Sequence, residues 1–121
     1  GGKRKAVCPG RVSDVKSTPP SSEEEALLRM SPELYTSNLT IVRTEKGLRE
    51  VLAFNDRHSR SANMIVINRL TVGSLLSTAA LTRQESRGTH YREDFLDTSP
   101  AWEKRIVLSR SEEGTPKVEF R

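Results

Sequence analysis

The 121-residue chain has room for one domain, because a single hydrophobic core is usually built from about 100 to 150 residues. Hydrophobic residues make up 34% of the sequence and charged residues 30%, so the core is small or is completed by a surface outside the chain. The net charge of +4 comes from 20 basic residues interleaved with 16 acidic ones, and the absence of a basic stripe with stacking aromatics argues against nucleic-acid binding.

Cysteine and histidine are too scarce for disulfide or zinc chemistry. Cys8 has no partner for an internal disulfide, and together with the two histidines it makes no zinc-ligand spacing. We therefore expect no metal site and a reducing, cytoplasmic location. No run of about 18 apolar residues is evident, so we also expect no direct membrane insertion.

The amino-terminal part of the chain differs in composition from the rest. Residues 1–20 are rich in Gly, Pro, Ser and Lys and show neither helix nor strand periodicity. Such a segment is typical of a linker or disordered leader. The expected domain therefore spans residues 21–121.

The first helix is expected directly after this leader. Ser22 and Glu25 have the spacing of a capping box, which predicts a helix start. Ser31 followed by Pro32 repeats an N-cap with a first-turn proline. This repeat predicts a kink or a restart before the helix continues to Leu39.

Two further helices are predicted in the middle of the chain. Thr44 is a candidate N-cap for a helix from about 45 to 58. The most apolar segment, residues 63–87, predicts a long helix that is buried on much of its circumference. Gly73 indicates a close helix contact, and Gly88 stands where a left-handed C-cap belongs. Three helices with short connections predict an antiparallel three-helix bundle.

The end of the chain has strand patterning. Residues 105–109 carry an aliphatic, β-branched run, residues 111–116 are turn formers, and Val118 and Phe120 then alternate with polar neighbours. This pattern predicts a small hairpin, which must lie against the helices or another domain because an isolated hairpin is marginally stable. The predicted fold class is therefore mainly α with a C-terminal β-hairpin.

Ionisable residues are concentrated between the long helix and the hairpin. Residues 83–95 read Arg-Gln-Glu-Ser-Arg-Gly-Thr-His-Tyr-Arg-Glu-Asp-Phe. Arginine forks can bind a carboxylate such as that of Glu85. From the residues alone, a solvated helix end is favoured over a functional site. His90 as a general acid and Arg92 as a substrate clamp are conceivable, but a structural role for His90 is favoured.

This segment resembles the signature of the carboxyl-terminal domain shared by succinate dehydrogenase and fumarate reductase flavoproteins and by L-aspartate oxidase. The family pattern is Arg-x-Glu-Ser-Arg-Gly-x-His, commonly followed by an arginine, an acidic residue and an aromatic. The matching residues are Arg83, Glu85, Ser86, Arg87, Gly88, His90, Arg92, Asp94 and Phe95. Leu96 departs from the pattern, which usually has proline there. Thr40–Leu52 and the terminal hairpin with Trp102 are also similar, so the resemblance covers about residues 32–121.

The resemblance implies that the chain is part of an FAD-dependent dicarboxylate oxidoreductase whose flavin and substrate sites lie elsewhere in the parent protein. The sequence contains no G-x-G-x-x-G turn, so we assign no catalytic and no cofactor-binding residue to this chain. The implied partner is the flavin-binding domain of the same polypeptide. The candidates for docking onto that domain are Arg83, Glu85, Arg87, His90, Arg92 and Asp94.

Several interpretations of the parent protein remain open. The short connection at 58–63 and the sequence Asn68-Arg69-Leu70 followed by Val72 slightly favour L-aspartate oxidase, which converts aspartate to iminoaspartate for NAD biosynthesis. A succinate dehydrogenase or fumarate reductase flavoprotein is the close alternative, which implies a membrane-peripheral location and an iron–sulfur partner subunit. A free-standing helical interaction module is a third interpretation.

Overall fold

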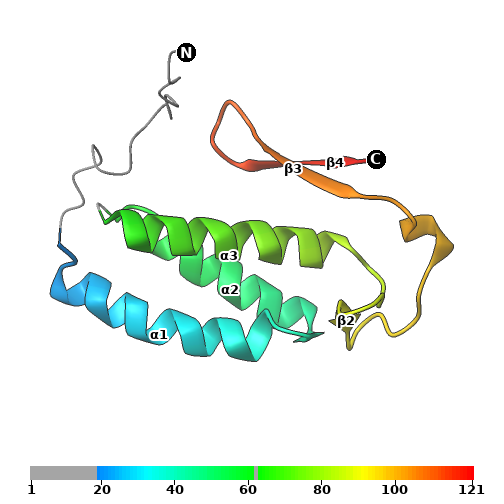
Figure 1. The fold of residues 1–121 in the computed structure, drawn as a ribbon, viewed down its shortest axis with the longest axis horizontal. Coiled ribbons are helices and arrows are strands. Elements are labelled where there is room, and N and C mark those ends of the chain that lie inside the picture. The colour runs from blue at the N-terminus through cyan, green and yellow to red at the C-terminus, as the bar shows by residue number, and fades with distance from the viewer. Residues whose placement is uncertain (1–18, 62) are drawn as a thin grey trace, which may run out of the picture.

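The computed structural model describes residues 19–61 and 63–121, in which three helices are followed by a C-terminal hairpin (Figure 1). The elements in chain order are α1 (Ser22–Asn38), β1 (Val42–Arg43), α2 (Glu45–Arg57), α3 (Met64–Thr82), β2 (Tyr91–Arg92), the 3-10 helix η2 (Pro100–Trp102), β3 (Ile106–Arg110) and β4 (Pro116–Phe120). The mainly helical class and the terminal hairpin are confirmed, whereas the antiparallel order of the bundle stays a prediction. The expected leader lies, up to residue 18, outside the described residues.

Helix α1 begins one residue earlier than its capping pattern predicted. Ser21 is the N-cap: its side chain accepts a hydrogen bond from the Glu24 N–H at 3.2 Å, and its own N–H donates to the Glu24 carboxylate at 2.9 Å. The run of two serines and three glutamates offers the same capping box in two adjacent registers, at Ser21 and at Ser22. The local sequence therefore could not select between them.

Pro32 lies inside α1, so of the two predicted alternatives the restart is wrong, while a kink at this position stays a prediction. A proline in a helix leaves the carbonyl four residues earlier without its N–H donor. Here that carbonyl belongs to Leu28, and it accepts a hydrogen bond from Arg69 of α3 at 2.9 Å. The same Arg69 nitrogen lies 3.3 Å from the Ser31 hydroxyl, so a neighbouring helix satisfies the break and α1 continues.

The core lies between the three helices and consists of two small clusters. Each cluster combines apolar residues from helices or helix ends that are distant in sequence, namely Leu39, Leu48 and Ala80 in one and Phe54, Val66 and Leu70 in the other. A core of this size is small, as the composition indicated.

Helix α2 matches its prediction closely, since Thr44 caps it by accepting a hydrogen bond from the Gly47 N–H at 3.0 Å.

The predicted close contact at Gly73 is confirmed. A Cβ atom at this position would lie 2.6 Å from the Tyr35 hydroxyl and 3.0 Å from the Asn55 side-chain nitrogen. The Tyr35 hydroxyl donates to the side-chain oxygen Oδ1 of Asn55 at 2.7 Å, and the side-chain nitrogen Nδ2 of Asn55 donates to Leu70 O at 3.2 Å. This polar contact joins α1, α2 and α3 at the point where only a glycine fits.

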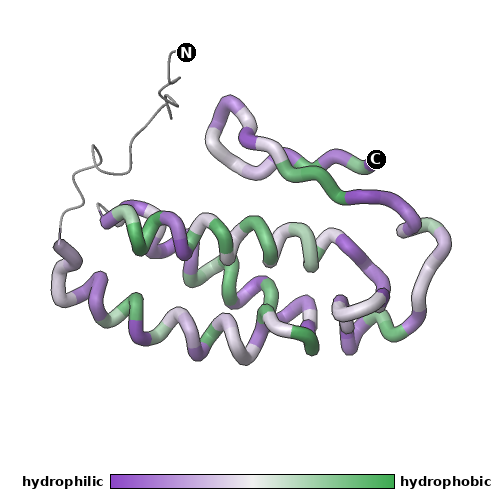
Figure 2. The backbone as a smooth tube through the Cα atoms, viewed as in Figure 1, coloured by the Kyte–Doolittle hydropathy of each residue, from purple (hydrophilic) through white to green (hydrophobic). Residues whose placement is uncertain are grey.

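Helix α3 differs from its prediction in length and in burial. It ends at Thr82 instead of residue 87, and Arg83 is the extended C-cap, so Gly88 caps no helix. Only one face of α3 is buried, and large apolar residues along its other side are exposed. Figure 2 shows hydrophobic residues along the whole length of α3. The expected burial on much of the circumference is therefore wrong for this chain.

The length and composition of α3 also correct the expectation about membrane segments. Among the described residues, α3 is the one helix that is long and apolar enough to cross a membrane by these criteria alone. Core helices of soluble proteins pass the same test. The composition of α3 therefore does not distinguish a membrane helix from a core helix, and its contacts with neighbouring elements have to be considered.

Two small sheets complete the fold. The hairpin strands β3 and β4 pair antiparallel with Leu108 opposite Val118, and the connecting turn contains Gly114 at a positive φ of 84°. The hairpin lies alongside α3 (Figure 1). Strands β1 and β2 form a parallel pair that the sequence did not predict, because two residues per strand are too few to show a period.

Candidate functional site

The charged segment 83–95 folds into a loop at the carboxyl end of α3. Arg87 and His90 exchange two backbone hydrogen bonds, of 2.8 and 3.0 Å, around a tight turn. Gly88 occupies this turn with a φ of 58°, a left-handed conformation that favours glycine. The chain then returns along β1 as strand β2, which brings the polar residues of the segment together.

Glu85 is the buried anion of this loop, with a fully inaccessible side chain. Its carboxylate accepts hydrogen bonds from Arg83 at 2.6 Å, from Arg87 Nε at 2.9 Å and from the Ser99 N–H at 2.8 Å. The hydrogen bond from Arg87 is the main reason that the pKa of Glu85 is lowered to about 2, with Ser99 and Arg83 contributing against the effect of burial. The carboxylate is therefore ionised and joins the end of α3 to the segment before η2.

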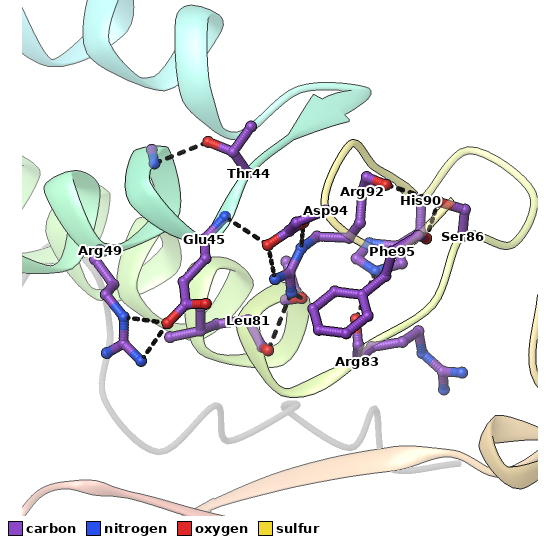
Figure 3. A network of polar contacts seen from close by, with 12 residues as sticks. Thr44, Glu45, Arg49, Leu81, Arg83, Ser86, His90, Arg92, Asp94 and Phe95 are labelled. Atoms are coloured by element: carbon purple, nitrogen blue, oxygen red, sulfur yellow. Dashed lines mark hydrogen bonds and ion pairs between the residues drawn. The ribbon is translucent and has the colours of Figure 1, made fainter. Parts of the chain in front are cut away.

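Arg92 is the buried cation of the loop, and its side chain is 1% exposed. It binds Asp94 through a two-pronged contact, from Nε to Oδ1 at 2.7 Å and from Nη2 to Oδ2 at 2.6 Å. The remaining nitrogen, Nη1, donates to the carbonyls of Ala80 and Leu81 at 2.9 and 3.1 Å (Figure 3). These carbonyls belong to the last turn of α3, where a helix lacks internal donors and favours a positive charge.

Asp94 extends the same contact to the next helix. Its Oδ2 accepts a hydrogen bond from the N–H of Glu45, the first residue of α2, at 3.1 Å (Figure 3). Arg92 is the main cause of the lowered pKa of Asp94. The Arg92–Asp94 pair thus places its cation at the carboxyl end of α3 and its anion at the amino end of α2, as the two helix dipoles require.

His90 is held between an arginine side chain and an arginine backbone. Because arginine only donates, the 2.7 Å contact from Arg43 makes the His90 Nδ1 an acceptor, and Nε2 then donates to Arg83 O at 3.1 Å. Burial is the first cause of the lowered pKa of His90; the hydrogen bond to Arg83 O opposes it, and the charges of Arg43, Arg92 and Arg83 add to it. The ring is therefore neutral and both of its nitrogens are occupied, which favours a structural role over general acid catalysis.

The six predicted docking residues lie in the same loop, and each has a partner within the chain. Among the arginines of the loop, Arg87 is the most exposed at 39%, but it binds the fully buried Glu85, so it is not the solvated charge that the sequence suggested. A docking role for these residues stays a prediction. Within residues 19–61 and 63–121, no group of three or more His, Cys, Asp and Glu residues could hold a metal ion.

Sequence reasoning missed partners of the loop that lie far away in the chain. Arg43 reaches His90 from 47 positions upstream, and the Ser99 N–H reaches Glu85 from 14 positions downstream. Arg43 lies in the Thr40–Leu52 segment that already resembled the family, which was the one signal that could have pointed to it. The Ser99 contact uses a backbone group and leaves no mark in the sequence.

Comparisons with known proteins show the family to which the chain is similar. Residues 30–121 match the family described as fumarate reductase flavoprotein C-term. The chain is 52% identical over 46 residues to a subunit of the fumarate reductase (CoM/CoB) of Methanothermobacter marburgensis, which covers 38% of this chain and 8% of that protein. It is 30% identical over 95 residues to an uncharacterized FAD-dependent oxidoreductase of Methanocaldococcus jannaschii, covering 68% of this chain and 18% of that protein.

A third relative is L-aspartate oxidase of Rhodospirillum rubrum, with 29% identity over 105 residues, covering 86% of this chain and 38% of that protein. The chain thus spans between 8% and 38% of the length of these relatives. The family match includes the whole charged loop, both helices that it joins and the terminal hairpin. The chain belongs to the family of fumarate reductase flavoprotein C-terminal domains.

Proposed function

We propose that this chain is the C-terminal helical domain of an FAD-dependent dicarboxylate oxidoreductase, and that it supports the flavin-containing part without supplying a catalytic group. The observation that carries the proposal is the loop 83–95 inside the family match, where the charged side chains bind helix ends and backbone. In this proposal the three helices form an antiparallel bundle that packs on the flavin-binding and capping domains of a cytoplasmic protein.

Among the members of the family, we favour L-aspartate oxidase for the parent protein. The similarity to the enzyme of Rhodospirillum rubrum extends over 86% of this chain. The parent protein would then oxidise L-aspartate to iminoaspartate and pass a hydride to FAD. A fumarate reductase or succinate dehydrogenase flavoprotein is the second candidate, supported by the 52% identity to the methanogen protein over a shorter segment. That candidate adds an iron–sulfur partner subunit.

The polypeptide encoded by the complete reading frame tests both levels of the proposal. We expect it to contain FAD, and we expect L-aspartate to bleach the flavin absorbance under anaerobic conditions while succinate does not. Bleaching by succinate and not by L-aspartate would select the second candidate. A reading frame that encodes no flavin-binding domain would favour a free-standing interaction module and contradict the proposal.

A further inference from the structure

Helix α3 exposes an apolar face that a solvated helix does not normally have. Ile65, Val72 and Leu76 are 56%, 56% and 52% exposed, and their spacing of seven and four residues places them on one side of the helix. Met64 and Leu75 are also among the exposed large hydrophobic residues. These five residues are called the α3 face below. Clustered exposed apolar residues of this kind mark interaction surfaces.

The only charged residue of α3 does not interrupt this face. Arg69 directs its guanidinium to α1, where it binds Leu28 O at 2.9 Å and lies 3.3 Å from the Ser31 hydroxyl. The other polar residues of α3, such as Asn68 and Thr71, have neutral side chains. A partner for this surface must therefore be apolar and needs no charge to complement it.

The charged loop and the α3 face differ as docking surfaces. In the loop, Glu85 and Arg92 are buried and paired within the chain, so their hydrogen-bonding capacity is already used. Burial of the α3 face by a partner removes apolar area from water without breaking any internal contact, at about 25 cal/mol per Å². The docking surface expected from the sequence is therefore better sought on α3 than in the loop.

The contacts of α3 argue against a lipid bilayer as the partner. Its opposite face is tied to the other helices by the close approach of Tyr35 to Gly73 and by the hydrogen bond from Asn55 to Leu70 O. A helix that spans a membrane alone would have to leave these contacts and carry Arg69 into the apolar layer. A helix that lies on a membrane usually has a polar face rich in Lys and Arg, which α3 lacks.

We propose that the α3 face is the surface by which this domain docks onto the flavin-containing remainder of the oxidoreductase, against an uncharged apolar patch of that polypeptide. This inference rests on the proposed function. It is supported by the length of the relatives, since this chain covers only 18% of the Methanocaldococcus jannaschii oxidoreductase and most of that protein lies outside the match. That additional polypeptide is a source of apolar surface that a chain of this size lacks.

Cysteine labelling tests the proposal in the complete protein. The native Cys8 is replaced by Ser, and Val72→Cys is compared with Ala53→Cys, a matched control at an exposed position of α2. Maleimide labelling of each site is followed by peptide mass spectrometry in the 121-residue chain and in the polypeptide from the complete reading frame. We expect Val72→Cys to react about tenfold or more slowly in the complete protein, because labelling then requires local opening, whereas Ala53→Cys reacts equally in both.

Other outcomes overturn the proposal in distinguishable ways. A flavin-containing complete protein in which Val72→Cys stays as reactive as in the short chain would show that α3 is not the docking surface. Protection of the short chain that rises with its concentration would indicate a second copy as the partner. Protection by phosphatidylcholine–phosphatidylglycerol vesicles would indicate a membrane. A complete protein without FAD would instead overturn the proposed function, and with it the identity of the partner.

Discussion

Arg92 has the largest fully buried side chain among the described residues, and it is charged. Its partner Asp94 is 30% exposed, so removal of Arg92 leaves a partly solvated carboxylate and two helix carbonyls without their donor. We expect Arg92→Met to lower the free energy of unfolding by about 1 to 3 kcal/mol. Arg92→Lys should lower it less, because the charge remains although the planar fork is lost. Denaturant unfolding followed by circular dichroism measures both changes.

The exposed pair formed by Arg49 and Glu45 is the control for this prediction. Their side chains are 63% and 52% exposed, so Arg49→Met should change the free energy of unfolding by only about 0 to 1 kcal/mol. Equal effects at Arg49 and Arg92 would contradict the assignment of Arg92 as the central clamp between α3 and α2.

His90 makes the stability of the chain depend on pH. Its pKa is below the ordinary value of 6.5, first because of burial, so the unfolded chain binds more protons than the folded chain in this range. The contribution of His90 to the free energy of unfolding is therefore fully present above pH 6.5. It is lost as the pH falls through the lowered pKa of the folded chain. The slope is smaller than about 1.4 kcal/mol per pH unit, because one proton is the limit and the ring is only partly buried.

Substitution of His90 separates this effect from other titrations. Glutamine in His90→Gln offers an acceptor to Arg43 and a donor to Arg83 O but does not titrate. Urea unfolding at several pH values below 6.5 should therefore show a weaker pH dependence for His90→Gln than for the parent chain. An unchanged pH profile for His90→Gln would count against this role of His90.

At the scale of the elements, Gly73 sets how closely the helices approach. Alanine is normally the better helix residue by about 1 kcal/mol. At this position, however, its Cβ would lie 2.6 Å from the Tyr35 hydroxyl and would disturb the bond to Asn55. Overpacking of this kind costs on the order of 1 to 3 kcal/mol. We therefore expect Gly73→Ala to lower the thermal unfolding midpoint by several degrees.

A second background tests the steric cause at Gly73. When Tyr35→Ala removes the hydroxyl and the ring, the obstacle to the new Cβ is largely gone. Gly73→Ala should then raise the midpoint, because alanine stabilises a helix by about 1 kcal/mol relative to glycine. A destabilising effect of the same size in both backgrounds would mean that the helix contact is not the cause.

At the scale of the whole molecule, the chain is expected to be folded but not to bind flavin. No Gly-rich phosphate-binding turn is present in the sequence, and the charged loop is closed by its own pairs. Titration of FAD with the 121-residue chain should leave the flavin fluorescence unchanged, whereas we expect the protein from the complete reading frame to bind FAD. Stoichiometric binding by the chain alone would contradict its assignment as a supporting domain.

Elements with local signals were predictable from the sequence. Thr44 and the leucines after it define α2, and the aliphatic run with the turn near Gly114 defines the hairpin, because capping and alternation are interactions between near neighbours. The charged signature also pointed to the family that residues 30–121 match. The residues of this signature were identified as a group because they are close together in the sequence.

Only the tertiary structure decided how that group is used and which surface remains open. Arg92 is buried and binds the carboxyl end of α3, and Arg43 binds His90, which lies 47 positions away in the sequence. Arg69 donates to the Leu28 carbonyl that Pro32 leaves without a donor. Each of these contacts joins segments that only packing brings together. The composition indicated that α3 is apolar, but it did not indicate which side of the helix is buried. Burial depends on which other elements pack against the helix, and a periodic pattern does not identify them. The sequence by itself therefore determined the helices, the hairpin and the family. Packing determined that the charged side chains of the loop bind partners within the chain and that the apolar side of α3 is exposed.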